Sequence, residues 1–436
     1  MTNYNITNNN NKRLTYPSLL VIFFIASLSF LQITVCSASS LPVNKMGSDS
    51  LMSYAVNYSA TSNLNTGVDP KDFFDLFRKP RKIYNDNKTD SSKNTGSGPY
   101  FAFLPAIGYA IASGYIGGLA TCVSFYTDPG KTKNSSVLAG AYYTQFNQYW
   151  TIINSNILLD NEKFNLIGDW RCYKFPTNTF GLGSNTTTDE ADSITYNYLK
   201  IYEVGLEEVL PNLYVGIGYH LDYHFNISEI NHVNKITDFK QYGLASQSVS
   251  SGISANLLYD NRANNINPLK GTYANFQFRQ NSTLLGSNKN WNSVLIDARE
   301  YFTLPASSKN VLALWSYNSF VFGNAPYMDL PSVGWDSYNN TGRGYAQGRF
   351  RGKEFVYLES EYRFGITDNG LLGGVIFANE ESFSEWPSNF MGRLQPGYGF
   401  GVRIKLNKHS STNLAIDYGF GTQQSRGFYF NLGEVF

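Results

Sequence analysis

Three side chains in one short stretch, His220, Asp222 and His224, have the chemistry of metal ligands. Residues two apart in a β-strand share a face, so all three would point the same way if residues 213–225 form a strand. His220 and His224 would then lie about 13 Å apart, at roughly 3.3 Å per residue. One zinc ion, with ligand bonds of about 2 Å, cannot bind both histidines. We therefore interpret these residues as polar lining and predict no metal site.

The residues that nucleophilic catalysis needs are scarce. The chain has four histidines, and two of them, His232 and His409, fall in predicted loops or turns. The sequence contains neither a Gly-x-Ser-x-Gly nor a His-Glu-x-x-His motif. The stretch Gly181-Leu-Gly183 lacks the lysine and the strand–helix context of a phosphate-binding loop. We predict no catalytic residue, no cofactor and no enzymatic activity.

The composition indicates which elements carry these residues. Aromatic residues make up 16% of the 436-residue chain and charged residues only 15%, well below the share of about 25% in soluble domains. A formal net charge of +1 gives no basic surface for nucleic acid. A mean hydropathy of −0.28 excludes a bundle of membrane helices. The three cysteines indicate no disulfide framework. This balance favours membrane strands with one face in lipid.

From about residue 98 to 436 the sequence alternates with a period of two, as in residues 213–225. One face there carries Leu213, Val215, Ile217, Tyr219, Leu221, Tyr223 and Phe225. The other face carries Tyr214, Gly216, Gly218, His220, Asp222 and His224. Residues 398–406 repeat the pattern. Such strands have an apolar wall backed by a polar wall.

Sixteen segments of this kind can be counted, the first of them interrupted by Pro105. They are 99–108, 114–126, 134–145, 147–159, 162–175, 193–207, 211–225, 248–260, 270–282, 290–304, 309–322, 354–365, 370–378, 396–407, 412–421 and 427–436. Short connections, such as 160–161 and 208–210, alternate with long ones at 176–192, 226–247, 323–353 and 379–395. Short turns on one side and long loops on the other are typical of bacterial outer-membrane barrels. We predict an all-β fold, a transmembrane antiparallel β-barrel of sixteen strands over residues 98–436, surrounded by outer-membrane lipid.

The N-terminal part reads as a signal peptide over residues 1–38. Lys12-Arg13 precedes an apolar run at 18–35, and small residues follow at 37–39. Residues 39–97 are polar and predict a short, disordered periplasmic linker, with one amphipathic piece at 72–77. The expected location is the bacterial outer membrane.

Motifs along the barrel resemble those of the BamA/TamA-type bacterial surface antigens. They are Tyr259-Asp-Asn-Arg262 with Asn267-Pro-Leu-Lys-Gly271, Arg343-Gly344-Tyr345, Glu361-Tyr-Arg-Phe364, Gly373-Gly-Val-Ile-Phe377, Asp417-Tyr-Gly-Phe-Gly421 and the final Phe436. Each motif alone is weakly specific, but their order and spacing together are strongly specific.

The resemblance implies that the sixth external loop folds back into the barrel. Arg343, with Gly344 and Tyr345, would pair there with Glu361 and the adjacent Glu359 on the twelfth strand. Without the resemblance, Arg343 would be an exposed loop cation. The family's second acid falls at Asn379, so the resemblance implies either a weaker lock or a substitute at Glu380.

The resemblance implies a role in outer-membrane protein assembly or polypeptide translocation. Phe428, Phe430 and Phe436 resemble a C-terminal barrel signal, and a weak seam is expected between the first and last strands. The expected partners are client barrel proteins or periplasmic and lipoprotein subunits, and no nucleic acid. Family members with this role carry POTRA domains, which residues 40–97 are too short to hold, so the chain resembles barrel-only members. The alternative function is a pore or a structural barrel subunit without insertase activity.

Overall fold

The computed structural model describes most of the barrel region and a short piece before it. The described residues are 70–76, 100–110, 114–125, 127, 135–145, 147–174, 176–230, 240, 242, 245–262, 267–306, 308–336, 340–385, 391–407, 412–432 and 434–436. The predicted signal peptide at 1–38 and nearly all of the predicted linker at 39–97 lie outside them. Among the described residues, no helix has the length and apolar character needed to cross a membrane.

The chain forms one large antiparallel sheet. The first eight strands are β1 (Tyr100–Ala110), β2 (Gly114–Phe125), β3 (Ser135–Thr144), β4 (Tyr149–Leu159), β5 (Phe164–Lys174), β6 (Thr177–Thr179), β7 (Asp192–Leu210) and β8 (Leu213–Ile230). The others are β9 (Gln247–Asp260), β10 (Gly271–Asn281), β11 (Trp291–Thr303), β12 (Val311–Gly323), β13 (Glu354–Gly365), β14 (Leu372–Ser384), β15 (Gln395–Asn407), β16 (Thr412–Phe420) and β17 (Arg426–Leu432). The described residues also contain four 3-10 turns: η2 (Phe73–Leu76), η3 (Thr188–Glu190), η4 (Thr283–Leu285) and η5 (Tyr327–Asp329).

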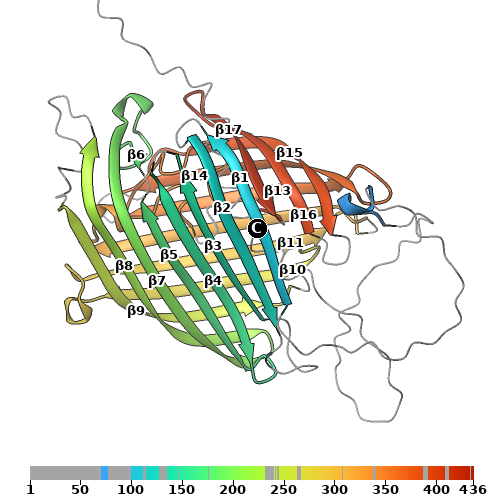
Figure 1. Cartoon of the computed structure of the whole chain (residues 1–436), viewed down its shortest axis with the longest axis horizontal. Helices are drawn as coiled ribbons and strands as arrows, with labels where there is room; N and C mark the ends of the chain where they lie inside the picture. The colour runs from blue at the N-terminus through green and yellow to red at the C-terminus, as the bar shows by residue number, and fades with distance from the viewer. Residues whose placement is uncertain are drawn as a thin grey trace, which may run out of the picture.

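Each strand pairs with its neighbour in sequence, with one exception. The three-residue β6 pairs only with the start of β7, while β5 and β7 pair directly. The sheet therefore contains the sixteen long strands that were predicted, with one short addition. Figure 1 shows it curving so that β2 to β5 and β7 to β9 lie in front of β10 and β11. We call the enclosed space the lumen.

The two ends of the sheet are not joined by hydrogen bonds in the part of the chain that the structure describes. β1 pairs with β2 along its whole length, and β17 pairs with β16, but no ladder links β1 to β17. Pro105 lies within β1, opposite Leu119. Proline has no N–H to donate, so its place on an end strand fits this arrangement.

The predicted alternation is confirmed in β8 and β13. In β8, Val215, Ile217 and Tyr219 are exposed on the outer face, whereas His220 is buried on the lumen side. Apolar side chains facing outward are what a strand in lipid requires. The polar face consequently lines the lumen.

Three predicted strand ends are wrong by four residues or more. β8 continues to Ile230, beyond the predicted end at residue 225. β14 continues to Ser384, beyond the predicted end at residue 378, and β17 ends at Leu432 instead of 436. The extension of β14 brings Asn379 and Glu381 onto the lumen face. Its outer residues there are polar, so the hydrophobic pattern ends before the hydrogen bonding does.

The predicted amphipathic piece at 72–77 contains η2. Asp72 and Asp75 close this turn reciprocally, because the backbone N–H of each donates to the carboxylate of the other at 3.1 Å. The N–H of Lys71 donates to the carbonyl of Asn369 at 3.1 Å. The turn therefore lies against the short connection between β13 and β14.

Candidate functional site

The long connection between β12 and β13 enters the lumen over its described residues, 324–336 and 340–353; we call these residues the lumen loop. Val333, Tyr345 and Phe350 of this loop are at most 2% exposed. They pack in one cluster with Phe355 and Phe383 of the wall. An apolar segment that is buried this way is stabilised by about 25 cal/mol per Å² of apolar surface removed from water.

Arg343 lies at the centre of the site, with 1% of its side chain exposed. Its Nη1 donates to Oδ2 of Asp417 at 2.5 Å, and its Nη2 donates to both Glu359 and Glu361. Its guanidinium also lies over the ring of Phe377, 3.7 Å from the centroid. The predicted partners Glu359 and Glu361 are therefore beside Arg343 in the structure.

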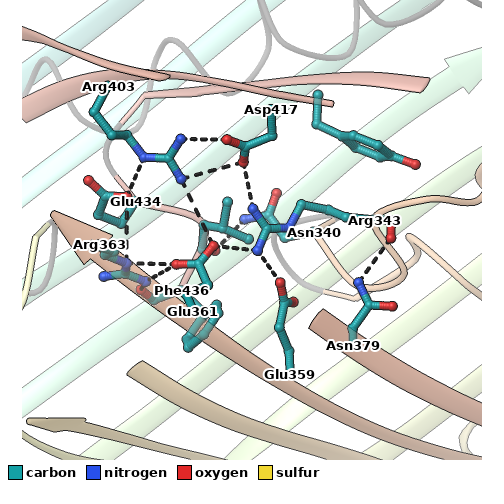
Figure 2. Close-up of polar contacts among 12 residues, drawn as sticks. Asn340, Arg343, Glu359, Glu361, Arg363, Asn379, Arg403, Asp417, Glu434 and Phe436 are labelled. Carbon is teal, nitrogen blue, oxygen red and sulfur yellow. Dashed lines mark hydrogen bonds and ion pairs between the residues drawn. The ribbon is translucent and has the colours of Figure 1, made fainter. Parts of the chain in front are cut away.

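Two of these acids, Glu361 and Asp417, belong with Arg343 to a closed ring of ion pairs (Figure 2). The pairs that complete the ring are Glu361–Arg363 at 2.6 Å, Arg363–Glu434 at 3.6 Å, Glu434–Arg403 at 2.6 Å and Arg403–Asp417 at 2.5 Å. Acids and arginines alternate around it. The ring therefore connects the lumen loop, three wall strands and the residues after β17.

The electrostatic balance at Arg343 keeps its guanidinium charged. Burial alone would lower the pKa of Arg343, but the carboxylates of Glu359, Glu361 and Asp417 raise the pKa well above its ordinary value. Removing one member of a buried ion pair typically costs about 3–5 kcal/mol, because its partner stays buried without compensation. Every member of the ring is thus held by the others.

The glycine after Arg343 allows the loop to approach the wall closely. Gly344 has φ of 118°, and a Cβ built there would lie 2.6 Å from the carbonyl oxygen of Phe420. Only glycine tolerates both the conformation and the contact. The Gly344 N–H donates to the hydroxyl of Tyr429 at 2.6 Å. The Arg-Gly-Tyr motif is therefore seated directly on β16 and β17.

Tyr345 anchors the other side of the motif. Its hydroxyl donates to the carbonyl of Pro396 at 2.7 Å and accepts from the N–H of Thr422 at 3.0 Å. Burial raises the pKa of Tyr345, so the hydroxyl remains a donor. Gly344 and Tyr345 thus both fix the position of the motif against the wall.

Asn379, which stands where the family has its second acid, has a different role in this structure. Asn379 does not contact the guanidinium; its Nδ2 donates to the backbone oxygen of Arg343 at 2.9 Å. Glu380 is exposed on the outer face and does not substitute, which corrects that alternative. Asp417 supplies the third carboxylate. Its place on the polar face of the 412–421 segment was the signal that could have identified it.

Two more arginines of the lumen loop bind carbonyl oxygens. Arg351 donates to the carbonyls of Tyr327 and Leu330 at 3.1 and 3.2 Å, which closes η5. Arg349 donates to the carbonyl of Thr186 at 2.6 Å. These arginines stabilise the shape of the loop, while Arg343 attaches it to the acidic wall.

A second attachment lies at η5. Asp329 accepts a hydrogen bond from Ser250 of β9 at 2.6 Å, and its Oδ1 lies 3.4 Å from Nδ1 of His224. Burial, together with the nearby charge of Asp222, raises the pKa of Asp329 to about 8. The carboxyl therefore titrates in the neutral to mildly basic range.

The three aromatic residues of the predicted C-terminal signal lie in different surroundings. The ring of Phe428 is half-buried, 4.6 Å from that of Tyr418. Phe430 pairs with Ile416 through its backbone, and its side chain lies outside the described residues. Phe436 is not on a strand: it is buried in the lumen, with its ring 5.0 Å from that of Trp315. Their role as a signal stays a prediction.

The metal-like triplet on β8 is part of a different polar network. Asp222 pairs with Arg279 at 2.7 Å and accepts from the hydroxyl of Tyr198 at 2.5 Å. His220 contacts Ser254 at 2.7 Å. Within the described ranges, no group of three or more potential ligands is arranged to hold a metal ion. What the site as a whole offers is a buried electrostatic clamp between loop and wall.

Comparison with solved structures gives matches that include the following two proteins. The crystal structure of BamA from Haemophilus ducreyi lacking POTRA domains 1-3 has a TM-score of 0.50 and 15% sequence identity, over 77% of this chain and 69% of that one. CdiB from Acinetobacter baumannii has a TM-score of 0.48 and 12% identity, over 77% of this chain and 59% of that one. The first similarity shows the fold.

Comparison by sequence gives the family. No curated protein matches the sequence. The Omp85 superfamily domain matches residues 124–436, most of the chain and nearly all of its strands. The predicted resemblance is confirmed: this chain belongs to the Omp85 superfamily.

Proposed function

We propose that this protein is a bacterial outer-membrane barrel that assists the assembly or translocation of other polypeptides. The observation that carries the proposal is the lumen loop, which Arg343 holds against Glu359, Glu361 and Asp417 inside an Omp85 barrel. Its partners would be client barrel proteins and periplasmic or lipoprotein subunits. The proposal involves no catalytic chemistry.

The unjoined ends of the sheet support the same role. β1 and β17 share no ladder within the described residues, so each presents backbone N–H and C=O groups on one side. Such an edge is a template on which a further strand can form. A client polypeptide in an extended conformation has the geometry to use it.

The proposal is tested by depletion followed by proteomics of the outer membrane. Depletion should lower the amounts of several other barrels, and re-expression of the wild-type chain should restore them. Arg343→Met should restore them poorly, whereas Arg393→Met should restore them fully, because Arg393 is an exposed arginine in the connection to β15. If other barrels assemble normally after depletion, the proposed function is wrong.

A second candidate, a conducting pore, is favoured by the charged inner wall. Arg171, Lys200, Arg279 and Arg299 are all buried on the lumen side. Polar linings of this kind conduct ions when nothing blocks them. In planar bilayers a plugged pore would show a stable conductance that increases in Arg343→Met, while an assembly barrel would show none in either protein.

A further inference from the structure

The residues after β17 leave the sheet and enter the lumen; we call residues 434–436 the inner segment. The side chain of Glu434 is 2% exposed, and Val435 and Phe436 are 3% and 4% exposed. In Figure 2 both Glu434 and Phe436 lie among the side chains of the ion-pair ring. The inner segment therefore occupies a defined recess of the wall.

One half of this recess binds a carboxylate. Oε2 of Glu434 accepts from Nε of Arg403 at 2.6 Å and lies 3.6 Å from Nε of Arg363. Oε1 of Glu434 accepts from Nδ2 of Asn413 at 2.6 Å. Asp417 accepts from a different nitrogen of Arg403, Nη1, at 2.5 Å, whereas Glu361 accepts from the same Nε of Arg363 at 2.6 Å. A carboxylate at this position thus accepts hydrogen bonds from Arg403 and Asn413 and shares the charge of Arg363 with Glu361.

The other half binds an aromatic ring. Phe436 stacks on Trp315 with ring centroids 5.0 Å apart, and it lies 6.3 Å from Tyr301. The guanidinium of Arg363 lies 5.1 Å from the same ring, and its Nη2 donates to the backbone oxygen of Phe436 at 3.0 Å. Arg363 therefore contacts both the acid and the aromatic residue. Together the two halves select an acid followed, two residues later, by an aromatic residue.

The inner segment is also linked to the lumen loop. Nδ2 of Asn340 donates to the backbone oxygen of Val435 at 2.5 Å. Arg403 bridges Glu434 and Asp417, and Asp417 in turn holds Arg343. Departure of the inner segment would remove contacts from the loop as well as from the wall.

We propose that this recess is a binding site for an acid–x–aromatic segment of another polypeptide, which displaces the inner segment of the chain itself. Glu434 and Phe436 are held by side-chain contacts with Arg403 and Trp315, and another polypeptide with an acid and an aromatic residue at this spacing can make the same contacts. The inner segment is attached through β17, seven residues that pair only with β16 in the described part of the chain. That the displacing polypeptide is a client rests on the proposed function; the binding chemistry does not.

A fluorescent peptide with the sequence of residues 431–436 tests the proposal by anisotropy, using the full-length barrel in detergent. In the wild type the tethered segment competes at an effective concentration on the order of millimolar, so the peptide should bind weakly. The double variant Glu434→Gln with Phe436→Ala weakens that competitor and should bind the peptide at least about tenfold more tightly. Adding Trp315→Ala should abolish the gain.

Control peptides test the chemistry of the site. Replacing the peptide's glutamate by glutamine, or its phenylalanine by alanine, should each weaken binding about tenfold. Equal binding of all peptides, or equal binding by the Trp315→Ala protein, would overturn the proposal. A heat-modifiable gel shift establishes that each variant is folded. If the double variant is not folded, competition in the wild type decides: unlabelled native peptide should displace the label, and the glutamine peptide should not.

The outcome separates this proposal from the proposed function. If the purified barrel binds the peptide specifically but depletion leaves other barrels unaffected, the binding site is supported and the proposed client is not. If depletion impairs assembly but the purified barrel shows no saturable peptide binding, the proposed function is supported and the proposed binding site is wrong.

Discussion

Replacing Arg343 by methionine removes the central cation of the ring while preserving much of the side-chain volume. The ring and its neighbour Glu359 contain three arginines and four carboxylates, which gives one negative charge in excess. Without Arg343 the excess becomes two. Glu361 keeps Arg363 and Asp417 keeps Arg403, but among the described residues Glu359 keeps only the hydroxyl of Tyr357. The simplest response of the buried site is to take up one proton.

The cost of that proton sets the magnitude. The ordinary pKa of a glutamate carboxylate is about 4.3, so pH 7 lies roughly 2.7 units above it. At about 1.36 kcal/mol per unit, protonating the carboxylate at pH 7 costs roughly 3.7 kcal/mol. This agrees with the loss of about 3–5 kcal/mol typical of a broken buried pair. At pH 5 the same estimate falls to about 1 kcal/mol. The variant should therefore lose about 3–4 kcal/mol of unfolding free energy at pH 7 and about 1 kcal/mol at pH 5.

Urea unfolding of the purified barrel in detergent, followed by the gel-mobility shift, measures these losses at both pH values. Arg393→Met controls for removal of an arginine from an exposed site. Adding Glu359→Gln to Arg343→Met should recover most of the loss at pH 7, because the carboxylate left without a cation is then gone. Equal losses at pH 5 and pH 7, or no recovery with Glu359→Gln, would refute the charge argument.

Three further substitutions test other parts of the clamp. Asn379→Asp restores the family acid but removes the donor to the backbone oxygen of Arg343, so the urea midpoint should fall by the equivalent of about 1–2 kcal/mol instead of rising. Gly344→Ala should cost about 1–3 kcal/mol by the same measurement, whereas Gly365→Ala, which has open space at its Cβ, should cost little. The raised pKa of Asp329 means that its stabilising protonated form is fully present below about pH 4 and is lost as pH rises through about 8. Asp329→Asn should therefore melt above the wild type at pH 9 and closer to it at pH 6; a constant difference would contradict this.

The strands and their inner faces were predictable because lipid imposes a simple rule. An outward apolar side chain at every second residue identified the face of Glu359, Glu361 and Arg363 on β13, and the structure buries all three. The rule fails where a strand rises beyond the lipid. Glu380 is exposed but polar there, and Ser382 is buried, so the alternation disappears while the ladder of β14 continues to Ser384.

The contents of the lumen could not be predicted in the same way. Val333 and Phe350 lie in a sequence rich in glycine and polar residues, and no period marks them as core residues. The sequence also gives no signal that the strand ends at Leu432, because Val435 and Phe436 continue the apolar character of β17. Asp417 was visible as a polar residue on an inner face, but its pairing with Arg343 depends on loop placement, which sequence spacing does not encode.

The site combines two kinds of contact that serve different ends. The buried cluster of Val333, Tyr345 and Phe350 against Phe355 and Phe383 provides non-directional stabilisation, which tolerates small shifts of the loop along the wall. A guanidinium that must meet carboxylates from β13 and β16 together has one position only. A buried ion pair is often no more stabilising than an apolar replacement, so its contribution here is better understood as fixing the register of the loop. On this view, loosening the ring by displacing Glu434 would leave the apolar contacts in place and free the loop to move over them.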